Sequence, residues 1–302
     1  MRIVTRPDFD GIVCAVLLIE ALDIREPVEW VEPNQIHRGL IDIQPGDIIA
    51  NMAFDERCSL WFDHHLSNRI DRPFQGCFQA SPSAARIIFE YYHKEFIRDF
   101  SPLVQAADKI DSADLSLNEV LNPENYPYIM LSSTIHSFRV SDRPYWDRLV
   151  NLLRSKDINQ ILKDPEVKKR AKSVIVENRK YLKVLQENTR IIKQVSITDF
   201  RSFETYPGGN RFLVFSIYPD TSVNLKIRFD ATNRDTVIVS IGHSIFNKTC
   251  QVNIGALCSR FGGGGHHGAG SCSFSKSQSE NIIQKIIDIL ISNQKNEDKR
   301  KI

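Results

Sequence analysis

Short apolar runs that end in polar residues alternate with helical patterns over the first third of the chain. The runs that resemble strands cover residues 1–5, 28–31, 47–51 and 60–62. Most have the length and continuous apolar character of buried strands. Helical patterns cover residues 11–22, 81–92 and 103–115. Because the first of these helices is almost entirely apolar, we expect it to pack on a sheet, as in an open α/β fold.

The pattern changes twice in the second half of the chain. Residues 144–192 are highly charged and helical in period, with a break at Pro165, which predicts a connector between domains. Beyond Val195, runs rich in β-branched and aromatic residues predict strands over 211–217, 224–229, 236–241 and 250–254. A helix over 280–292 follows, and we expect the charged tail after it to be frayed. A second, α+β domain is therefore predicted.

Three predicted strands end in residues that can bind a metal ion. Asp8 and Asp10 follow the first strand, Asn51 ends a second, and Asp63-His64-His65 follows a third. Carboxylate, amide and imidazole groups bind divalent cations, and the carboxyl ends of strands border the crevice where open α/β sheets bind ligands. In the alternative interpretation, Asp10 caps a helix and the Asp63-His64-His65 run is a solvated turn. Because metal-binding residue types recur at the ends of three predicted strands, the sequence favours a metal site over this alternative.

Two further groups carry candidate chemistry. Asp108, Asp111 and Asp114 lie at three-residue spacing in a predicted helix and form one acidic edge, of which we expect Asp114 to be solvated. Residues 259–270 contain four consecutive glycines followed by His266 and His267. Glycines leave backbone N–H groups open to a phosphate, whereas flexible linkers are usually Gly/Ser tracts. The pattern favours a binding loop over a linker.

Composition narrows the function classes. The chain has 302 residues, of which 42% are hydrophobic and 25% charged, so it is long enough for two domains. A net charge of +2 gives no broad basic field, and we expect no duplex DNA partner. The 6 cysteines form no C-x-x-C pair, which argues against a zinc knuckle, a disulfide framework and a thiol redox enzyme. With no long apolar run and no signal-peptide pattern, we expect a cytoplasmic protein without a membrane partner.

Together, Asp8-Phe9-Asp10-Gly11, Asp63-His64-His65 and the run Phe261–Gly270 resemble the motifs of the DHH family of phosphoesterases. The resemblance covers nearly the whole chain and is strongest to the exopolyphosphatase-related and nano-RNase-like members, through the opening Arg-Pro-Asp-Phe-Asp-Gly. It implies a parallel-sheet DHH catalytic domain over 1–135, a helical linker over 136–194, and a smaller α+β substrate-binding domain over 195–302. It also implies a cluster of two manganese ions in the cleft between the domains.

The resemblance further implies roles for individual residues. Asp8 would bind one metal ion and Asp10 the other, and His64 would complete the second ion with Asp108 or, one turn away, Asp111. Asp63 would hold the metal shell or orient His64, and His65 would face the substrate phosphate, so that Asp63, His64 and His65 are the catalytic candidates. The far end of the substrate would be bound by His266 and the backbone of Gly262, Gly263, Gly264 and Gly265. Independently of the resemblance, the flanking Arg260 offers hydrogen-bond donors and positive charge beside this run.

The chain departs from the family's pattern at the residues that would bind the first metal ion. Members usually have a metal-binding histidine shortly before the first aspartate, and the nearby Val4 and Arg6 cannot serve as that ligand here. Asn51 stands where members have a bridging aspartate. An amide binds a cation more weakly than a carboxylate does. We therefore expect one or two ions, Mn²⁺ or Mg²⁺, with the first weak or absent, and Arg6 as a phosphate ligand instead.

These observations lead to two hypotheses. The primary one is a metal-dependent phosphoesterase in which a metal-activated water cleaves a small phosphorylated substrate: a short single-stranded oligonucleotide, a nucleotide bisphosphate, a cyclic dinucleotide or polyphosphate. The alternative is a DHH scaffold that binds a phosphorylated ligand or partner without hydrolysis. The sequence leaves open whether the protein forms a homodimer.

Overall fold

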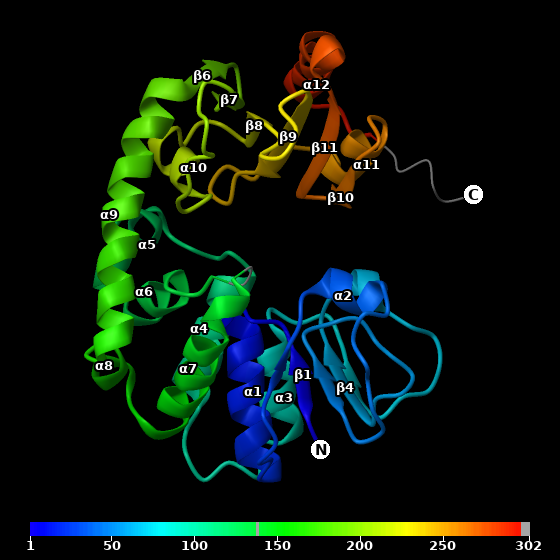
Figure 1. Cartoon of the computed structure of the whole chain (residues 1–302), viewed down its shortest axis with the longest axis vertical. Coiled ribbons are helices and arrows are strands. Elements are labelled where there is room, and N and C mark those ends of the chain that lie inside the picture. The colour runs from blue at the N-terminus through cyan, green and yellow to red at the C-terminus, as the bar shows by residue number, and fades with distance from the viewer. Residues whose placement is uncertain (137–138, 297–302) are drawn as a thin grey trace. The chain divides into compact units, whose positions relative to one another are not determined.

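The structure, a computed structural model, describes residues 1–136 and 139–296 (Figure 1). The remainder of the predicted frayed tail, residues 297–302, lies outside the described residues. The chain forms two compact units, residues 1–115 with 122–173, and residues 116–121 with the chain from 174 onward. The limits predicted from sequence, 135 and 194, remain predictions. Among the described helices, none is long and apolar enough to cross a bilayer.

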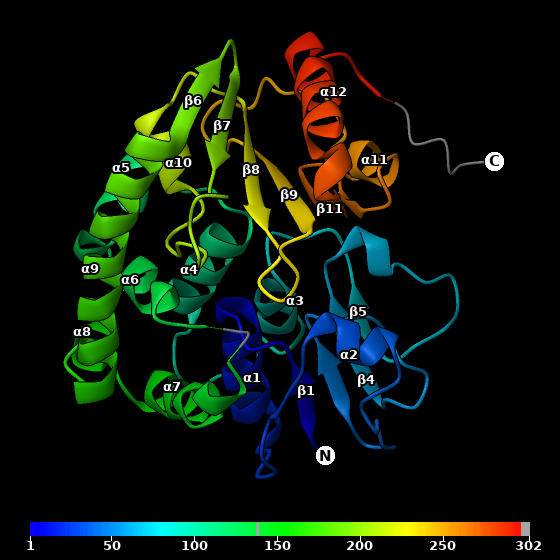
Figure 2. The ribbon, with the colours of Figure 1, turned by 45° about the horizontal axis from the view of Figure 1, so that its top comes forward.

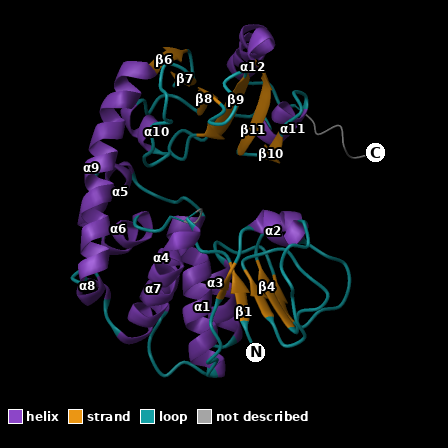
Figure 3. Ribbon diagram, in the orientation of Figure 1, coloured by secondary structure: helices purple, strands orange, loops and turns teal. Residues whose placement is uncertain are grey.

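The first unit is built on a parallel sheet of five strands in the order β2-β1-β3-β4-β5 (Figure 3). The strands are β1 (Ile3–Thr5), β2 (Glu29–Trp30), β3 (Ile48–Ala50), β4 (Leu60–Asp63) and β5 (Gly76–Phe78). The predicted α/β class with a parallel DHH-type sheet is confirmed. Strand β5 escaped prediction because its three residues include a glycine and carry no alternating pattern.

Helices α1, α3, α4 and α7 enclose the main core on one face of this sheet. The helices of the first unit are α1 (Phe9–Leu22), α2 (Pro33–His37), α3 (Ala84–Tyr91), α4 (Ser101–Asp111), α6 (Pro127–Ser133), α7 (Arg143–Ser155) and α8 (Ile158–Ile161). Helix α1 is apolar on nearly every side because it lies between the sheet and the other helices. Helix α7 comes from the predicted linker, yet it buries Trp146 and Leu149 in this core.

The opposite face of the sheet has a second core. Side chains alternate between the two faces of a strand, so Val4, Ile49 and Trp61 point away from the helices. Trp61 is fully buried, donates from Nε1 to the carbonyl of Met52 at 2.8 Å, and stacks on Phe78 with ring centroids 5.3 Å apart. Strand β4 is thus held on both faces just before Asp63.

The second unit is a six-stranded sheet in the order β10-β11-β9-β8-β7-β6, antiparallel except between β7 and β8 (Figure 2). Its elements are α5 (Leu117–Leu121), β6 (Thr189–Ile192), β7 (Val195–Asp199), α10 (Leu213–Ile217), β8 (Val223–Phe229), β9 (Thr236–His243), α11 (Ile254–Ser259), β10 (Gly264–His266), β11 (Ala269–Ser275) and α12 (Ser279–Ser292). Helix α9 (Pro165–Asn188) runs from the first unit into the second. The predicted second α+β domain is confirmed.

Two predicted strands of this unit are wrong. The run 211–217 contains α10, because its consecutive apolar residues Leu213, Val214 and Phe215 suit a buried helix turn as well as a strand. The run 250–254 is an irregular segment whose alternating buried residues mimic a strand. It ends where the side chain of Asn253 accepts a hydrogen bond from Ala256 N at 3.0 Å and caps α11.

A substitution at Gly76 tests how closely strands β4 and β5 approach each other. Its φ is +114°, and an added Cβ would lie 2.1 Å from the carbonyl oxygen of Trp61. We expect Gly76→Ala to destabilise the first unit by roughly 2–5 kcal/mol, from strain and overlap together. Gly46→Ala is the matched control, since Gly46 has φ +99° but no atom within 4 Å of the added Cβ. Equal melting temperatures for the two variants by calorimetry would contradict this close approach.

Candidate metal centre

The carboxylate of Asp10 is buried where the N-termini of two helices meet. Asp10 lies in the first turn of α1 and is 2% exposed. The N–H groups of Ala84 and Ala85, which open α3, donate to its two oxygens at 2.9 Å each. Those N–H groups have no partner within their own helix. Burial, and then the charges of Asp111 and Asp8, raise the pKa of Asp10 well above its usual range. The site therefore favours an added cation.

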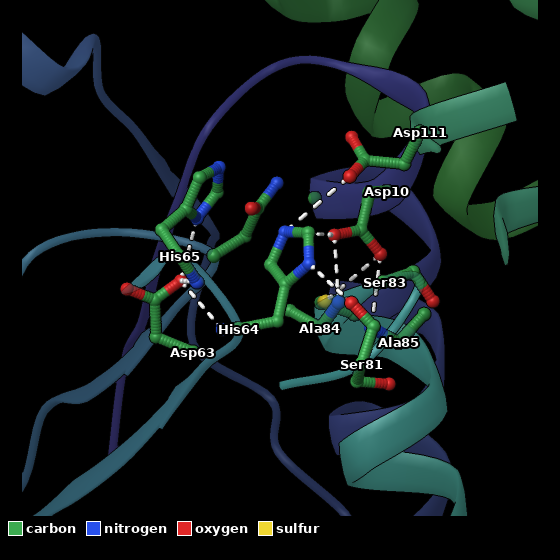
Figure 4. A network of polar contacts seen from close by, with 12 residues as sticks. Asp10, Asp63, His64, His65, Ser81, Ser83, Ala84, Ala85 and Asp111 are labelled. Atoms are coloured by element: carbon green, nitrogen blue, oxygen red, sulfur yellow. Dashed lines mark hydrogen bonds and ion pairs between the residues drawn. The ribbon is translucent and has the colours of Figure 1, made fainter. Parts of the chain in front are cut away.

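His64 turns its second ring nitrogen toward this carboxylate. Its Nδ1 lies 3.0 Å from the carbonyl oxygen of Ser81, and because a carbonyl only accepts, Nδ1 carries the proton. The other nitrogen, Nε2, is buried and has no hydrogen-bond partner among the described residues. It lies 3.3 Å from Oδ2 of Asp111 and 3.9 Å from Oδ2 of Asp10 (Figure 4). A lone pair and two carboxylates thus converge.

This donor set fits a divalent cation. Ligand atoms of Asp10, His64 and Asp111 all lie within 4.8 Å of one another. Burial and then the charge of Asp8 raise the pKa of Asp111, so the carboxylates repel each other without a cation. A metal ion would use the otherwise unpartnered Nε2 of His64, whose second nitrogen is already fixed by a carbonyl, the arrangement usual for histidine ligands. One ion accounts for these atoms.

Asp108, the preferred sequence candidate, does not belong to this group. Its carboxylate accepts from Ser83 Oγ at 2.6 Å and from Nε and Nη2 of Arg86 at 3.0 and 2.5 Å. These donors satisfy the charge and hold the side chain against α3. Asp111, one turn along α4, faces His64 instead. Sequence could not decide between them, because i and i+3 positions share one helix face and the position of Arg86 is set by the fold.

Asp63 orients its neighbours. It is fully buried, and its oxygens accept from His64 N at 2.9 Å, His65 Nδ1 at 2.7 Å and Asn68 Nδ2 at 2.6 Å. Asp63, His64 and His65 also offer ligand atoms within 4.8 Å of one another, but both oxygens of Asp63 are already engaged. The hydrogen bond from Asp63 raises the pKa of His65. These contacts fit a positioning role for Asp63.

Asp8 and Asn51 lie close to the site, but their side chains are hydrogen-bonded to each other, and Asp8 also caps α1. Oδ1 of Asp8 caps α1 by accepting from Gly11 N at 2.9 Å, and it also accepts from Asn51 Nδ2 at 3.1 Å. Asn51 is buried at φ +57°, a left-handed conformation that asparagine tolerates. Its Oδ1 is buried without a hydrogen-bond partner among the described residues. Asn51 thus donates to Asp8, where an aspartate would repel it.

Arg6 supplies a positive charge beside Asp8. Its Nη1 lies 3.3 Å from Oδ2 of Asp8, and its Nε lies 3.9 Å from Oε2 of Glu32. Burial raises the pKa of Glu32, while the charge of Arg6 lowers it. With Asn51 and Gly11 on one oxygen and Arg6 beside the other, the carboxylate of Asp8 is satisfied by the protein itself.

The glycine-rich run of the second unit forms a strand. Gly264–His266 is β10, the edge strand paired with β11, so the flexible-linker alternative is wrong. An added Cβ on Gly263 would lie 2.1 Å from the carbonyl of Ser271, and one on Gly265, at φ +151°, would lie 2.2 Å from that of Ala269. Close backbone approach thus accounts for these two glycines. The predicted ligand contacts of Arg260 and of the Gly263, Gly264, Gly265 and His266 run remain predictions, and both Arg260 and His266 are exposed.

Sequence reasoning missed two parts of the site. Glu32 follows the strand β2 just as Asp8 follows β1, so the rule of polar residues at strand ends could have found it. The carbonyl of Ser81 fixes the His64 tautomer, but a backbone contact across 17 residues leaves no signal in residue types.

The structure is similar to several solved structures of known proteins. No family model and no curated protein sequence matches the chain. Among solved structures, it is similar to the pGpG-specific phosphodiesterase PggH from Vibrio cholerae, with 28% identity, a TM-score of 0.84, and coverage of 97% of this chain and 99% of that one.

Two more distant structures share the fold. The DHH domain of a member of the s1p family of ribosomal proteins has 12% identity and a TM-score of 0.64, covering 98% of this chain and 87% of that one. RecJ from Thermus thermophilus, solved with Mn²⁺, has 13% identity and a TM-score of 0.56, covering 96% of this chain and 52% of that one. The chain is thus similar in fold to DHH-family proteins, which is consistent with the resemblance of its motifs to those of DHH phosphoesterases.

Proposed function

We propose that this protein is a metal-dependent phosphodiesterase that hydrolyses short 5′-phosphorylated dinucleotides. The observation that carries the proposal is the buried Nε2 of His64, which faces the carboxylates of Asp10 and Asp111 and has no hydrogen-bond partner in the part of the chain that the structure describes. The similarity to a pGpG-specific phosphodiesterase, along almost the full length of both chains, supports a linear dinucleotide as the substrate within the predicted class.

In this proposal, the contacts of each residue indicate its role. Asp10, His64 and Asp111 would hold one Mn²⁺ or Mg²⁺, which when bound lowers the pKa of a water molecule and neutralises phosphate charge. Asp63 fixes His65 through Nδ1, and with a 40% exposed side chain His65 can donate from Nε2 to a phosphate oxygen. In this proposal the guanidinium of Arg6, held beside Asp8, binds a second phosphate oxygen in place of another metal ion.

Hydrolysis is the first test. With Mn²⁺, the wild-type chain should cleave pGpG, and His64→Ala should lower kcat/KM by roughly 10³-fold or more, since the metal supplies several kcal/mol. His93→Ala is the matched control, because His93 is exposed and, within the described part of the chain, its ring is hydrogen-bonded to the carbonyl of Glu90. Cleavage is followed by chromatography beside pApA, a nucleotide bisphosphate and polyphosphate.

Two outcomes would count against this proposal. Binding of pGpG without turnover, with manganese absent by elemental analysis, would establish the alternative of a non-hydrolysing phosphate-binding protein. Turnover of polyphosphate alone would keep the hydrolase and reject the dinucleotide.

Metal affinity distinguishes the two aspartates of α4. Asp111→Asn should weaken Mn²⁺ binding by about tenfold or more, because it removes a charged ligand. Asp108→Asn should change it by less than about threefold, because that carboxylate is paired with Arg86. Titration calorimetry gives both constants, and circular dichroism checks that each variant is folded. A larger loss in Asp108→Asn would reverse the assignment.

The number of ions depends on Asn51. In Asn51→Asp a carboxylate replaces the amide that donates to Asp8 at 3.1 Å, so two like charges meet. We expect this variant to melt below the wild type in EDTA and to bind about two Mn²⁺ per chain where the wild type binds about one. Two ions in the wild type, measured by elemental analysis after gel filtration, would refute the role assigned to Arg6.

A further inference from the structure

Two buried thiols of the second unit lie against each other. Cys258 belongs to α11 and is fully buried, and Cys272 belongs to β11 and is 3% exposed. Both are free thiols in the core of this unit, and their side chains share a hydrogen bond. The proposed hydrolysis uses neither of them. Sequence spacing does not pair them, because residues 259–271 lie between them.

Contacts of the backbone bring these two side chains together. Helix α11 packs against β10 and β11 (Figure 2). The carbonyl of Cys258 accepts from Gly263 N at 3.0 Å, and a Cβ added to Gly263 would lie 2.6 Å from the Cβ of Cys272. A Cβ added to Gly270 would lie 3.1 Å from Sγ of Cys258. Since residues two apart on a strand share one face, Cys272 projects from β11 on the side where this sulfur lies. The two thiols are therefore neighbours, as a disulfide requires.

The shared hydrogen bond makes the two thiols unequal. It raises the pKa of Cys258, as burial also does, and it lowers the pKa of Cys272. The S–H of Cys258 therefore donates, and the sulfur of Cys272 accepts. Because the thiolate is the form that attacks peroxides and disulfides, Cys272 is the nucleophile of the pair. In the same core, burial raises the pKa of Cys250, which makes its thiol less reactive.

The cover over Cys272 is thin. Gly263 lies against its Cβ and has no side chain of its own. The strand that follows, β10, is a three-residue edge strand, and all of its residues are exposed. A short exposed edge strand has few apolar contacts to lose, so it opens at a low cost in free energy. A small oxidant can therefore reach the sulfur of Cys272 when β10 opens.

We infer that Cys258 and Cys272 are a modification site that forms a reversible disulfide with a peroxide as the oxidant. In the first step, the Cys272 thiolate attacks one oxygen of hydrogen peroxide, the O–O bond breaks, and a sulfenic acid forms. The released hydroxide takes up the proton that Cys272 had lost. In the second step, the sulfur of Cys258 attacks that of Cys272, and its proton leaves with the hydroxyl group as water. One hydrogen peroxide and two thiols thus give one disulfide and two water molecules.

The disulfide would close residues 259–271 into a covalent loop. This loop contains the whole glycine-rich run with β10, and joining its ends reduces the conformations open to it. The bond would therefore restrain the opening of β10. The site needs neither a metal ion nor a nucleotide, so it is independent of the proposed hydrolysis. A single reversible bond also differs from the disulfide framework that the spacing of the cysteines argues against.

The test is oxidation of the full chain by hydrogen peroxide, followed by tryptic digestion and mass spectrometry. Trypsin cleaves after basic residues, so the two cysteines fall in separate peptides, 249–260 and 261–276. We expect these peptides to be joined, with a mass about 2 Da below their sum, because two hydrogen atoms are lost. Dithiothreitol should separate them again.

Cys250→Ala is the matched control, because Cys250 lies in the same core and in the same tryptic peptide as Cys258. This variant should keep the link, whereas Cys258→Ala and Cys272→Ala should each lose it, and circular dichroism checks that all three are folded. Two results would overturn the inference. One is the absence of the link from peroxide-treated wild type, and the other is a link that persists in Cys258→Ala.

Hydrogen exchange tests the covalent loop. Backbone N–H groups of residues 261–271 should exchange about tenfold or more slowly in the oxidised chain than in the reduced chain, because the bond restrains local opening. Equal exchange in the two forms would contradict the restraint on β10.

Discussion

The buried carboxylate of Asp10 is the interaction on which the first unit's site depends. It accepts from the first N–H groups of α3 while lying in the first turn of α1, so one side chain joins two helix N-termini, with Asp10 and Ala84 74 residues apart in sequence. Both helix ends favour negative charge, which offsets part of the desolvation of the carboxylate. The same contact positions the segment before α3, whose Ser81 carbonyl fixes the tautomer of His64. Fold and metal-binding geometry therefore share one contact.

The two halves of the site differ in how their charge is balanced. Around Asp8, the protein supplies its own donors from Gly11, Asn51 and Arg6. Around Asp10 and Asp111, two carboxylates with raised pKa values face a histidine nitrogen that has no hydrogen-bond partner among the described residues. The proposed single ion follows from this asymmetry. Arg6 differs from a metal ion in carrying fixed donors, which suits a planar approach to phosphate oxygens.

The sequence was most informative where chemistry repeats at equivalent positions. Polar residues after three strands predicted Asp8, Asp10 and the Asp63-His64-His65 run, because parallel strands bring their carboxyl ends to one edge of a sheet. It could not separate Asp108 from Asp111, because that depended on Arg86 arriving from another helix.

Two predicted strands of the second unit were wrong because residue spacing does not encode tertiary packing. The run 211–217 has apolar residues that suit either a strand or a short buried helix, and packing decides between them. The run 250–254 is an irregular segment that leads into the capped N-terminus of α11. The glycine-rich run was predicted as a loop, but it pairs as an edge strand because its glycines allow the backbone of β11 to approach.

The central claim is that one divalent ion lies between Asp10, His64 and Asp111. The most direct measurement is an anomalous difference map, collected at the manganese edge from crystals soaked in Mn²⁺. The account predicts one peak per chain, about 2.2 Å from His64 Nε2 and from a carboxylate oxygen of both Asp10 and Asp111. A peak on Asp108, a second peak between Asp8 and Asn51, or no peak at all would contradict it.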